Sequence, residues 1–181
     1  MPVQVYSLYI FDRHTECIYS KQWFQPAAAS APSTTAPSQQ QQTQADGSGP
    51  TPAVAERDAG ATVAAKPRRN RSGDDAKLVF GTVFSLRNMV RKLGGDDDAF
   101  ISFRTAQYKL HYYETPTNLR FALLTEPAAL SMRNVLHQIY INLWVEYVVK
   151  NPLSPVEHKG GEGVRNDMFE LGLDKFIRGL M

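Results

Sequence analysis

The residues best suited to covalent chemistry in this sequence are Cys17 and His14, which stand three positions apart. A thiol close to an imidazole is the arrangement of cysteine nucleophiles, but such a site also needs a third group that orients the histidine. No such group is evident. His14 falls in a predicted hairpin turn and Cys17 in the strand that follows, so the pair is interpreted as structural rather than catalytic.

Other candidate sites also lack the residue pattern that their chemistry requires. The remaining histidines are scattered and share no metal-ligand spacing with one another or with the cysteine. Asp96–Asp98 lacks the spaced carboxylates and the glycine of a calcium loop. Gly160–Gly163 lacks the Lys-Ser/Thr of a phosphate-binding loop. The sequence therefore predicts no metal, no cofactor and no catalytic residues; an enzyme with a dispersed site is the alternative.

Composition weighs against two classes of partner. The net charge of the 181 residues is +2 at pH 7, too small to indicate nucleic acid or a strongly anionic surface. The basic run Lys66–Arg71 is interpreted as solvated charge rather than as a nuclear signal or an RNA contact. No stretch approaches the ~20 apolar residues of a membrane span, and Met1–Ile10 lacks the features of a signal peptide. With one cysteine, these features predict a cytosolic protein.

A long polar segment interrupts the sequence between Gln25 and Ala76. It consists mainly of Ala, Ser, Thr, Pro, Gln and Gly and contains no aromatic residue. Such a segment buries too little apolar surface to offset its loss of entropy on ordering. We expect a single domain made of residues 1–24 and 77–181, with 25–76 as a disordered insertion.

Five strands are predicted outside this insertion. They span Val3–Phe11, Glu16–Phe24, Phe100–Thr105, Tyr108–Thr115 and Asn118–Thr125. A short polar turn joins the first two, and connections too short for a crossover join the last three, so all are expected to pair antiparallel. Apolar residues at successive positions of the first two strands predict burial on both faces, with helices on either side of the sheet.

The first predicted helix runs from Leu78 to Leu93 and is followed by a glycine pair that favours a helix end. Its expected core stripe is Val79, Val83, Leu86, Met89, Val90 and Leu93. A separate flank combines aromatic and arginine side chains, a mixture that is enriched at protein interfaces. That flank comprises Phe80, Phe84, Arg87 and Arg91.

A long helix is predicted from Thr125–Pro127, which supplies a capping residue and an early proline, to Lys150–Pro152. One broad apolar stripe on it is expected to face the sheet. A second stripe, on the opposite side, comprises Ile141, Trp144, Val145 and Val148. We expect the final amphipathic helix, Asp167–Leu180, to cover part of this stripe and a partner protein to cover the rest. With the flank of the first helix, it forms the candidate subunit interface.

The order of strands and helices, ββαβββαα, matches longin-like domains. Several segments resemble subunit 1 of the transport protein particle complex, TRAPP, a family of longin-like small subunits. These segments are Val5–Arg13, Tyr108–Thr117, Val135–Tyr140, Val148–Leu153 and Leu173–Leu180. The resemblance covers nearly the whole chain outside the insertion, which stands where compact family members have a short connection.

The resemblance implies an α+β fold in which a five-stranded antiparallel sheet lies between one helix and a pair of helices. It also implies a structural subunit in an assembly that promotes nucleotide exchange on a Rab GTPase and tethers vesicles in transport from the endoplasmic reticulum to the Golgi. The implied partners are other TRAPP subunits and, through the assembly, the Rab. The implied location is the cytoplasm, peripheral at cis-Golgi and endoplasmic reticulum membranes.

Other functions remain open at this point. The chain could be another longin-type trafficking module, such as an adaptor small chain or a SNARE regulatory domain, although no coiled-coil heptads follow the domain. A nucleic-acid binder is a further alternative, but the tyrosines alternate with apolar residues as core aromatics do.

Overall fold

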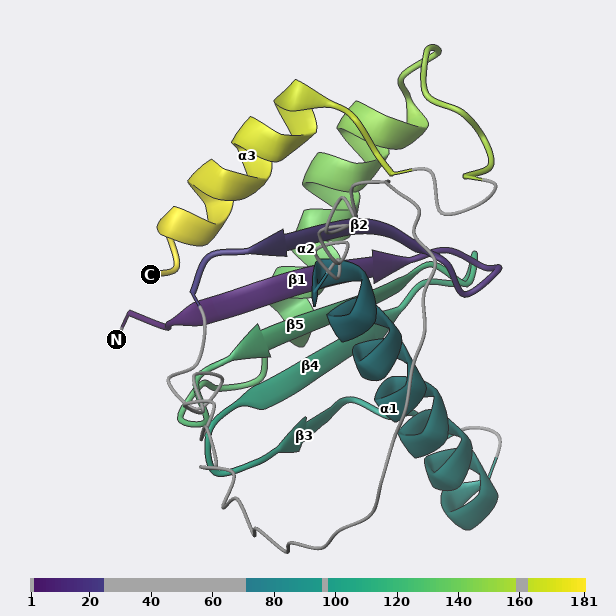
Figure 1. The fold of residues 1–181 in the computed structure, drawn as a ribbon, viewed down its shortest axis with the longest axis vertical. Helices are drawn as coiled ribbons and strands as arrows, with labels where there is room; N and C mark the ends of the chain where they lie inside the picture. The colour runs from purple at the N-terminus through teal and green to yellow at the C-terminus, as the bar shows by residue number, and fades with distance from the viewer. Residues whose placement is uncertain (1, 25–70, 96–97, 159–162) are drawn as a thin grey trace, which may run out of the picture. The chain divides into compact units, whose positions relative to one another are not determined.

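A five-stranded antiparallel sheet forms the centre of the fold (Figure 1). The computed structural model describes residues 2–24, 71–95, 98–158 and 163–181. The strands are β1 (Val5–Phe11), β2 (Cys17–Gln22), β3 (Ser102–Arg104), β4 (Lys109–Glu114) and β5 (Arg120–Thr125). Their order across the sheet is β2-β1-β5-β4-β3, which places β1 and β5 side by side near the centre.

Helices cover both faces of this sheet (Figure 1). They are α1 (Arg71–Gly94), α2 (Arg133–Gln138), the π-helix η2 (Ile139–Val149), which continues α2, and α3 (Asp167–Arg178). Alternate residues of β1 enter two separate cores: Leu8 and Ile10 pack on the side of η2 and α3, whereas Tyr9 and Phe11 pack on the side of α1. The predicted α+β fold, with one helix opposite a helix pair, is confirmed.

The two N-terminal strands differ in burial. All but one residue of β1 are buried, as its sequence predicts, whereas Ile18 is the one buried residue of β2. The prediction of two buried faces was therefore wrong for β2. The physical reason is its place at the edge of the sheet, where side chains such as Ser20 and Gln22 reach solvent.

Helix α1 begins at Arg71, seven residues before the predicted start at Leu78. Its first turns are polar, so apolar periodicity did not reveal them. Ala76, assigned to the insertion, is 3% exposed and belongs to the core under α1. The predicted core stripe was wrong for Met89 and Leu93, which are exposed. The rest of the predicted insertion, residues 25–70, lies outside the described part of the chain.

The long helix begins at Arg133, later than the predicted start near Pro127. Thr125 does not cap it, because the Thr125 hydroxyl donates to the carbonyl of Glu126 and contacts His111 at 3.0 Å. From Ile139 the helix widens to the π form, and the N–H of Lys150 donates to the carbonyl five residues earlier. Helix α3 agrees with its prediction to within two residues at its end.

Candidate subunit interface

On the predicted flank of α1, burial of the aromatic side chains decreases from the sheet outward. Phe80 is half-buried and packs against Phe11 of β1, with ring centroids 5.3 Å apart. Phe84 stacks on the outer side of Phe80 at 5.9 Å and remains 48% exposed. Phe80 therefore contributes to the fold, while Phe84 presents an aromatic face that nothing in the described chain covers.

Arg87 lies on the same flank but is engaged within the fold. Its Nε donates to one carboxylate oxygen of Glu114 at 2.7 Å and its Nη2 to the other at 3.1 Å, which is the strong two-pronged geometry. Arg120 Nε also donates to Glu114, at 3.3 Å. All three side chains are less than one-fifth exposed. Arg91, by contrast, is exposed and has no ion pair among the described residues.

The electrostatics of Glu114 follow from these contacts. Burial acts to raise the pKa of its carboxyl group, but the hydrogen bonds and charges of Arg87 and Arg120 outweigh burial and lower the pKa. Glu114 is therefore a carboxylate at neutral pH, and it neutralises one of its two arginine partners. The other positive charge is uncompensated at this edge of the sheet.

The predicted stripe on the long helix divides into core and surface. Trp144 and Val148 are each 5% exposed and lie in the core. The Trp144 ring meets the rings of Phe121 and Phe169 edge-on, at 6.3 and 5.7 Å. Ile141 is 42% exposed and Val145 is half-buried. The expectation that the whole stripe faces away from the sheet was therefore wrong for Trp144 and Val148.

The π form explains this division. Hydrogen bonds to the fifth residue, rather than the fourth, widen each turn and shift later side chains around the helix. Trp144 and Val148 then share the inward side with Ile139 and Leu143, and all four are buried. With an α-helical period they would lie opposite Ile139. Helix α3 supplies the predicted cover through Phe169.

The residues singled out for chemistry do not come together. The Cys17 thiol donates to the carbonyl of Tyr19 at 3.4 Å, while His14 Nδ1 lies 3.1 Å from the Asp12 carboxylate. Burial raises the pKa of Cys17, which disfavours the reactive thiolate. Across the described ranges, no three or more His, Cys, Asp or Glu side chains gather as a metal site. No helix among those same residues is long and apolar enough to cross a membrane.

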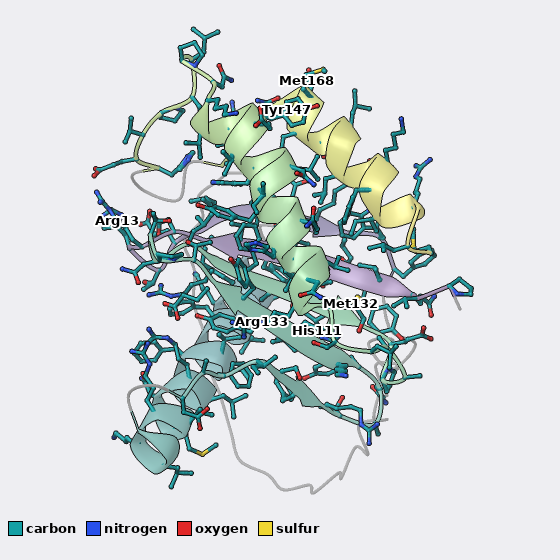
Figure 2. The ribbon with its side chains drawn as sticks, turned by 180° about the vertical axis from the view of Figure 1, so that it is seen from behind. Arg13, His111, Met132, Arg133, Tyr147 and Met168 are labelled. Atoms are coloured by element: carbon teal, nitrogen blue, oxygen red, sulfur yellow. The ribbon has the colours of Figure 1, made fainter. Side chains whose placement is uncertain are left out.

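His111 is the most deeply buried histidine among the described residues, at 2% exposed. Its Nε2 lies 3.0 Å from the Thr125 hydroxyl, and its Nδ1 accepts a hydrogen bond from the backbone N–H of Met132 at 3.4 Å. Burial, assisted by the charge of Lys109, lowers its pKa to about 4. Figure 2 shows His111 beneath the start of α2, next to Met132 and Arg133. The histidine therefore joins β4 to the start of α2.

Sequence reasoning missed the contribution of β4 and α2 to the flank of α1. Glu114, Tyr112 and Arg133 lie near Arg87 and Arg91 around a shared cavity. They are distant in sequence from α1, and only the pairing of β4 in the sheet brings them there. The Tyr108–Thr117 segment carried the resemblance to a family, but nothing in its residue pattern marked Glu114 as a partner of Arg87.

Comparison with known proteins agrees with this fold. The model of the Sybindin-like family matches residues 5–180. Transport protein particle subunit bet5 of Schizosaccharomyces pombe is 38% identical, over 97% of each chain. Trafficking protein particle complex subunit 1 of Rattus norvegicus is 33% identical over 97% of this chain and 93% of its own. Subunit BET5 of Saccharomyces cerevisiae is 31% identical over 87% and 80%. The resemblance seen in the sequence is confirmed, and the chain belongs to the Sybindin-like family.

Proposed function

We propose that this chain is a small structural subunit of a TRAPP complex. The observation that carries the proposal is its similarity, over nearly the full length of both chains, to proteins named as subunits of transport protein particles. The proposed partners are the other core subunits and, through the assembly, a Rab GTPase. The proposed role is to help the assembly promote nucleotide exchange during transport from the endoplasmic reticulum to the Golgi, at the cytoplasmic side of those membranes.

The geometry supports a role in assembly rather than in covalent chemistry. Exchange factors act by binding the nucleotide-free GTPase more tightly than the nucleotide-bound form, so they require complementary surfaces and no proton-transfer residues. On α1, the Phe84 side chain is 48% exposed, and its ring stacks on the ring of Phe80. An ordered, exposed aromatic side chain loses little entropy when a partner covers it.

A second exposed apolar surface lies on η2, at Ile141 and Val149. They are 42% and 63% exposed, on a helix whose other side is fixed against the sheet and α3. We propose that the α1 flank, through Phe84 and Arg91, and the outer side of η2, through Ile141 and Val145, contact neighbouring subunits. Arg87, Trp144 and Val148 support these surfaces from within the fold.

The proposal is tested by co-expressing the chain with the other core TRAPP subunits of the same organism. Phe84→Ala is expected to weaken co-purification by about tenfold while leaving thermal unfolding of the isolated chain nearly unchanged. Phe80→Ala is the matched control, because the same ring is removed one turn away at a half-buried site. Phe80→Ala should lower the unfolding temperature more than Phe84→Ala does, and it should weaken co-purification less. A wild-type chain that joins no such assembly would refute the proposed function.

A further inference from the structure

A cavity of about 370 Å³ opens beside the α1 flank. It is lined by Arg87 and Arg91 of α1, Tyr112 and Glu114 of β4, and Arg133 at the start of α2. The register of β3 with β4 ends at Ser102 opposite His111, and one further bond runs from the N–H of Tyr112 to the carbonyl of Ile101. The cavity thus lies beside the part of β4 that extends beyond this pairing, and side chains from both faces of the sheet reach it.

The charges around the cavity are unequal. Glu114 is already shared between Arg87 and Arg120, and Asp98 is the other acidic group in the lining. Arg91 and Arg133 have no ion pair with any described residue. Among the described residues of the lining, three arginines therefore face two carboxylates, an excess of one positive charge. Arg120, just behind Glu114, adds to this excess.

Tyr112 lies beside Glu114 in this lining and is 3% exposed. Burial, followed by the charge of Glu114, raises the pKa of its hydroxyl group, so the hydroxyl keeps its proton. Its oxygen is itself buried, so the exposed arginines, rather than this tyrosine, face a group that enters the cavity.

We infer that this cavity receives the carboxylate of an aspartate or glutamate side chain on a partner protein. Arg91 and Arg133, which are both exposed and line the cavity, would bind the carboxylate. Glu114 and Asp98 in the same lining would repel a phosphate dianion more strongly than a carboxylate, which carries a single negative charge. The inference rests on the proposed function only in taking the partner to be a neighbouring subunit.

The small number of available basic side chains in the lining also fits a protein side chain better than a membrane surface. Binding to anionic lipid requires several basic side chains that project together from a surface. Here Arg87 is held by Glu114, and its side chain is 17% exposed. A partner loop can insert one carboxylate beside it, as acidic side chains do at electrostatically complementary interfaces.

The test combines charge reversal with site-specific cross-linking in the full chain. Arg91→Glu with Arg133→Glu should weaken binding to the partner by about tenfold or more and remove most of its salt dependence. Lys92→Glu is the matched control, since it reverses the same charge on the next residue of α1, outside the cavity lining. It should change binding less than threefold. The neutral pair Arg91→Gln and Arg133→Gln checks the result without added repulsion.

A photoreactive p-benzoylphenylalanine at Ala99, which is exposed and lines the cavity, reports what occupies it in the cell. The expected cross-linked peptide contains Asp or Glu and is lost in the charge-reversed chain; Ala128, outside the lining, is the control position. Inorganic phosphate is the competing ligand. Saturable stabilisation of the wild-type chain by phosphate, absent in the double variant, would overturn the inference.

The outcomes separate this inference from the proposed function. Normal assembly of the Arg91→Glu, Arg133→Glu chain into a TRAPP complex would overturn the inference and leave the proposed function standing. A charge-dependent cross-link to an acidic segment of a protein outside any such complex would support the inference and count against the proposed function. A cross-linked peptide without acidic residues, or no cross-link at Ala99, would also overturn the inference.

Discussion

The backbone N–H of Met132 donates to Nδ1 of His111, so a strand histidine accepts a hydrogen bond from the residue that immediately precedes α2. Met132 has no capping side chain of its own. The Nδ1 atom accepts only in the neutral imidazole, whose Nε2–H then faces the Thr125 hydroxyl at 3.0 Å. Protonation of His111 would place a hydrogen on Nδ1. This N–H would then face the N–H of Met132, so two donors would oppose each other.

Acidification is therefore expected to destabilise the fold through His111. Its pKa is lowered from 6.5 to about 4 in the folded state by burial and by Lys109. Above pH 6.5 the histidine is neutral in both states and contributes nothing. Below that value the unfolded chain takes up the proton first, so stability falls until about pH 4. The expected loss from this group is about 3 kcal/mol.

Urea unfolding between pH 4 and 8 measures this effect. His111→Gln keeps a polar side chain at the site, and its stability should vary less with pH than that of the wild type, although it starts lower. Equal pH dependence in the wild type and the His111 variant would contradict the assignment.

The two parts of the predicted η2 stripe should respond differently to substitution. Trp144→Ala removes a buried ring that contacts Phe121 and Phe169, so the free energy of unfolding should fall by about 3–5 kcal/mol. Ile141→Ser changes a side chain that is 42% exposed, and the loss should stay below about 1 kcal/mol. Chemical denaturation of the isolated chain compares them directly. Similar losses would argue against the widened helical turn.

Sequence patterns predicted the elements whose signals are local. The connection between β4 and β5 is an example: it is too short for a crossover, and it forms a turn in which the N–H of Asn118 donates to the carbonyl of Thr115. Helix α3 is another, because its apolar spacing is regular and the Asn166 side chain accepts hydrogen bonds from the N–H groups of Met168 and Phe169. These signals lie within a few residues of what they specify.

The predictions were wrong where contacts between residues distant in sequence, or a π-helical rather than α-helical form, decide which side chains are buried. No local residue marks the change to the π form at Ile139, and an assumed α period placed Trp144 on the wrong side. The start of α1 at Arg71 is polar, so the burial of Ala76 depends on the sheet beneath it. Glu114 becomes a partner of Arg87 only because β4 and α1 meet in three dimensions. The sequence pattern grouped Phe84 with Arg87 but did not reveal that Phe84 is exposed while Arg87 is held by Glu114.

Two deletions distinguish the start of α1 from the segment before it. Replacing residues 27–69 by a short Gly/Ser linker should leave thermal stability similar or slightly higher, because loop closure changes by only ~0.6 kcal/mol per doubling of length. Extending the deletion through Asp75 removes the first turn of α1, just before the buried Ala76. That variant should lose about 1 kcal/mol or more. Calorimetry of both chains provides the comparison, and a large loss in the shorter deletion would contradict the insertion hypothesis.

The isolated chain is expected to have no exchange activity of its own. Release of nucleotide requires a surface that binds the empty GTPase more tightly than the loaded one. The exposed large apolar side chains of the described chain are spread over separate helices, for example Phe84 on α1 and Ile141 on η2, and the Arg91 cavity is assigned to a partner carboxylate. Adding the pure chain to a Rab loaded with fluorescent nucleotide should leave release at its spontaneous rate. Reconstitution with the other core subunits should raise the rate by orders of magnitude, and Phe84→Ala should reduce that gain in proportion to the assembly it prevents. Saturable acceleration by the chain alone would show that it forms the exchange surface by itself and would contradict a purely structural role.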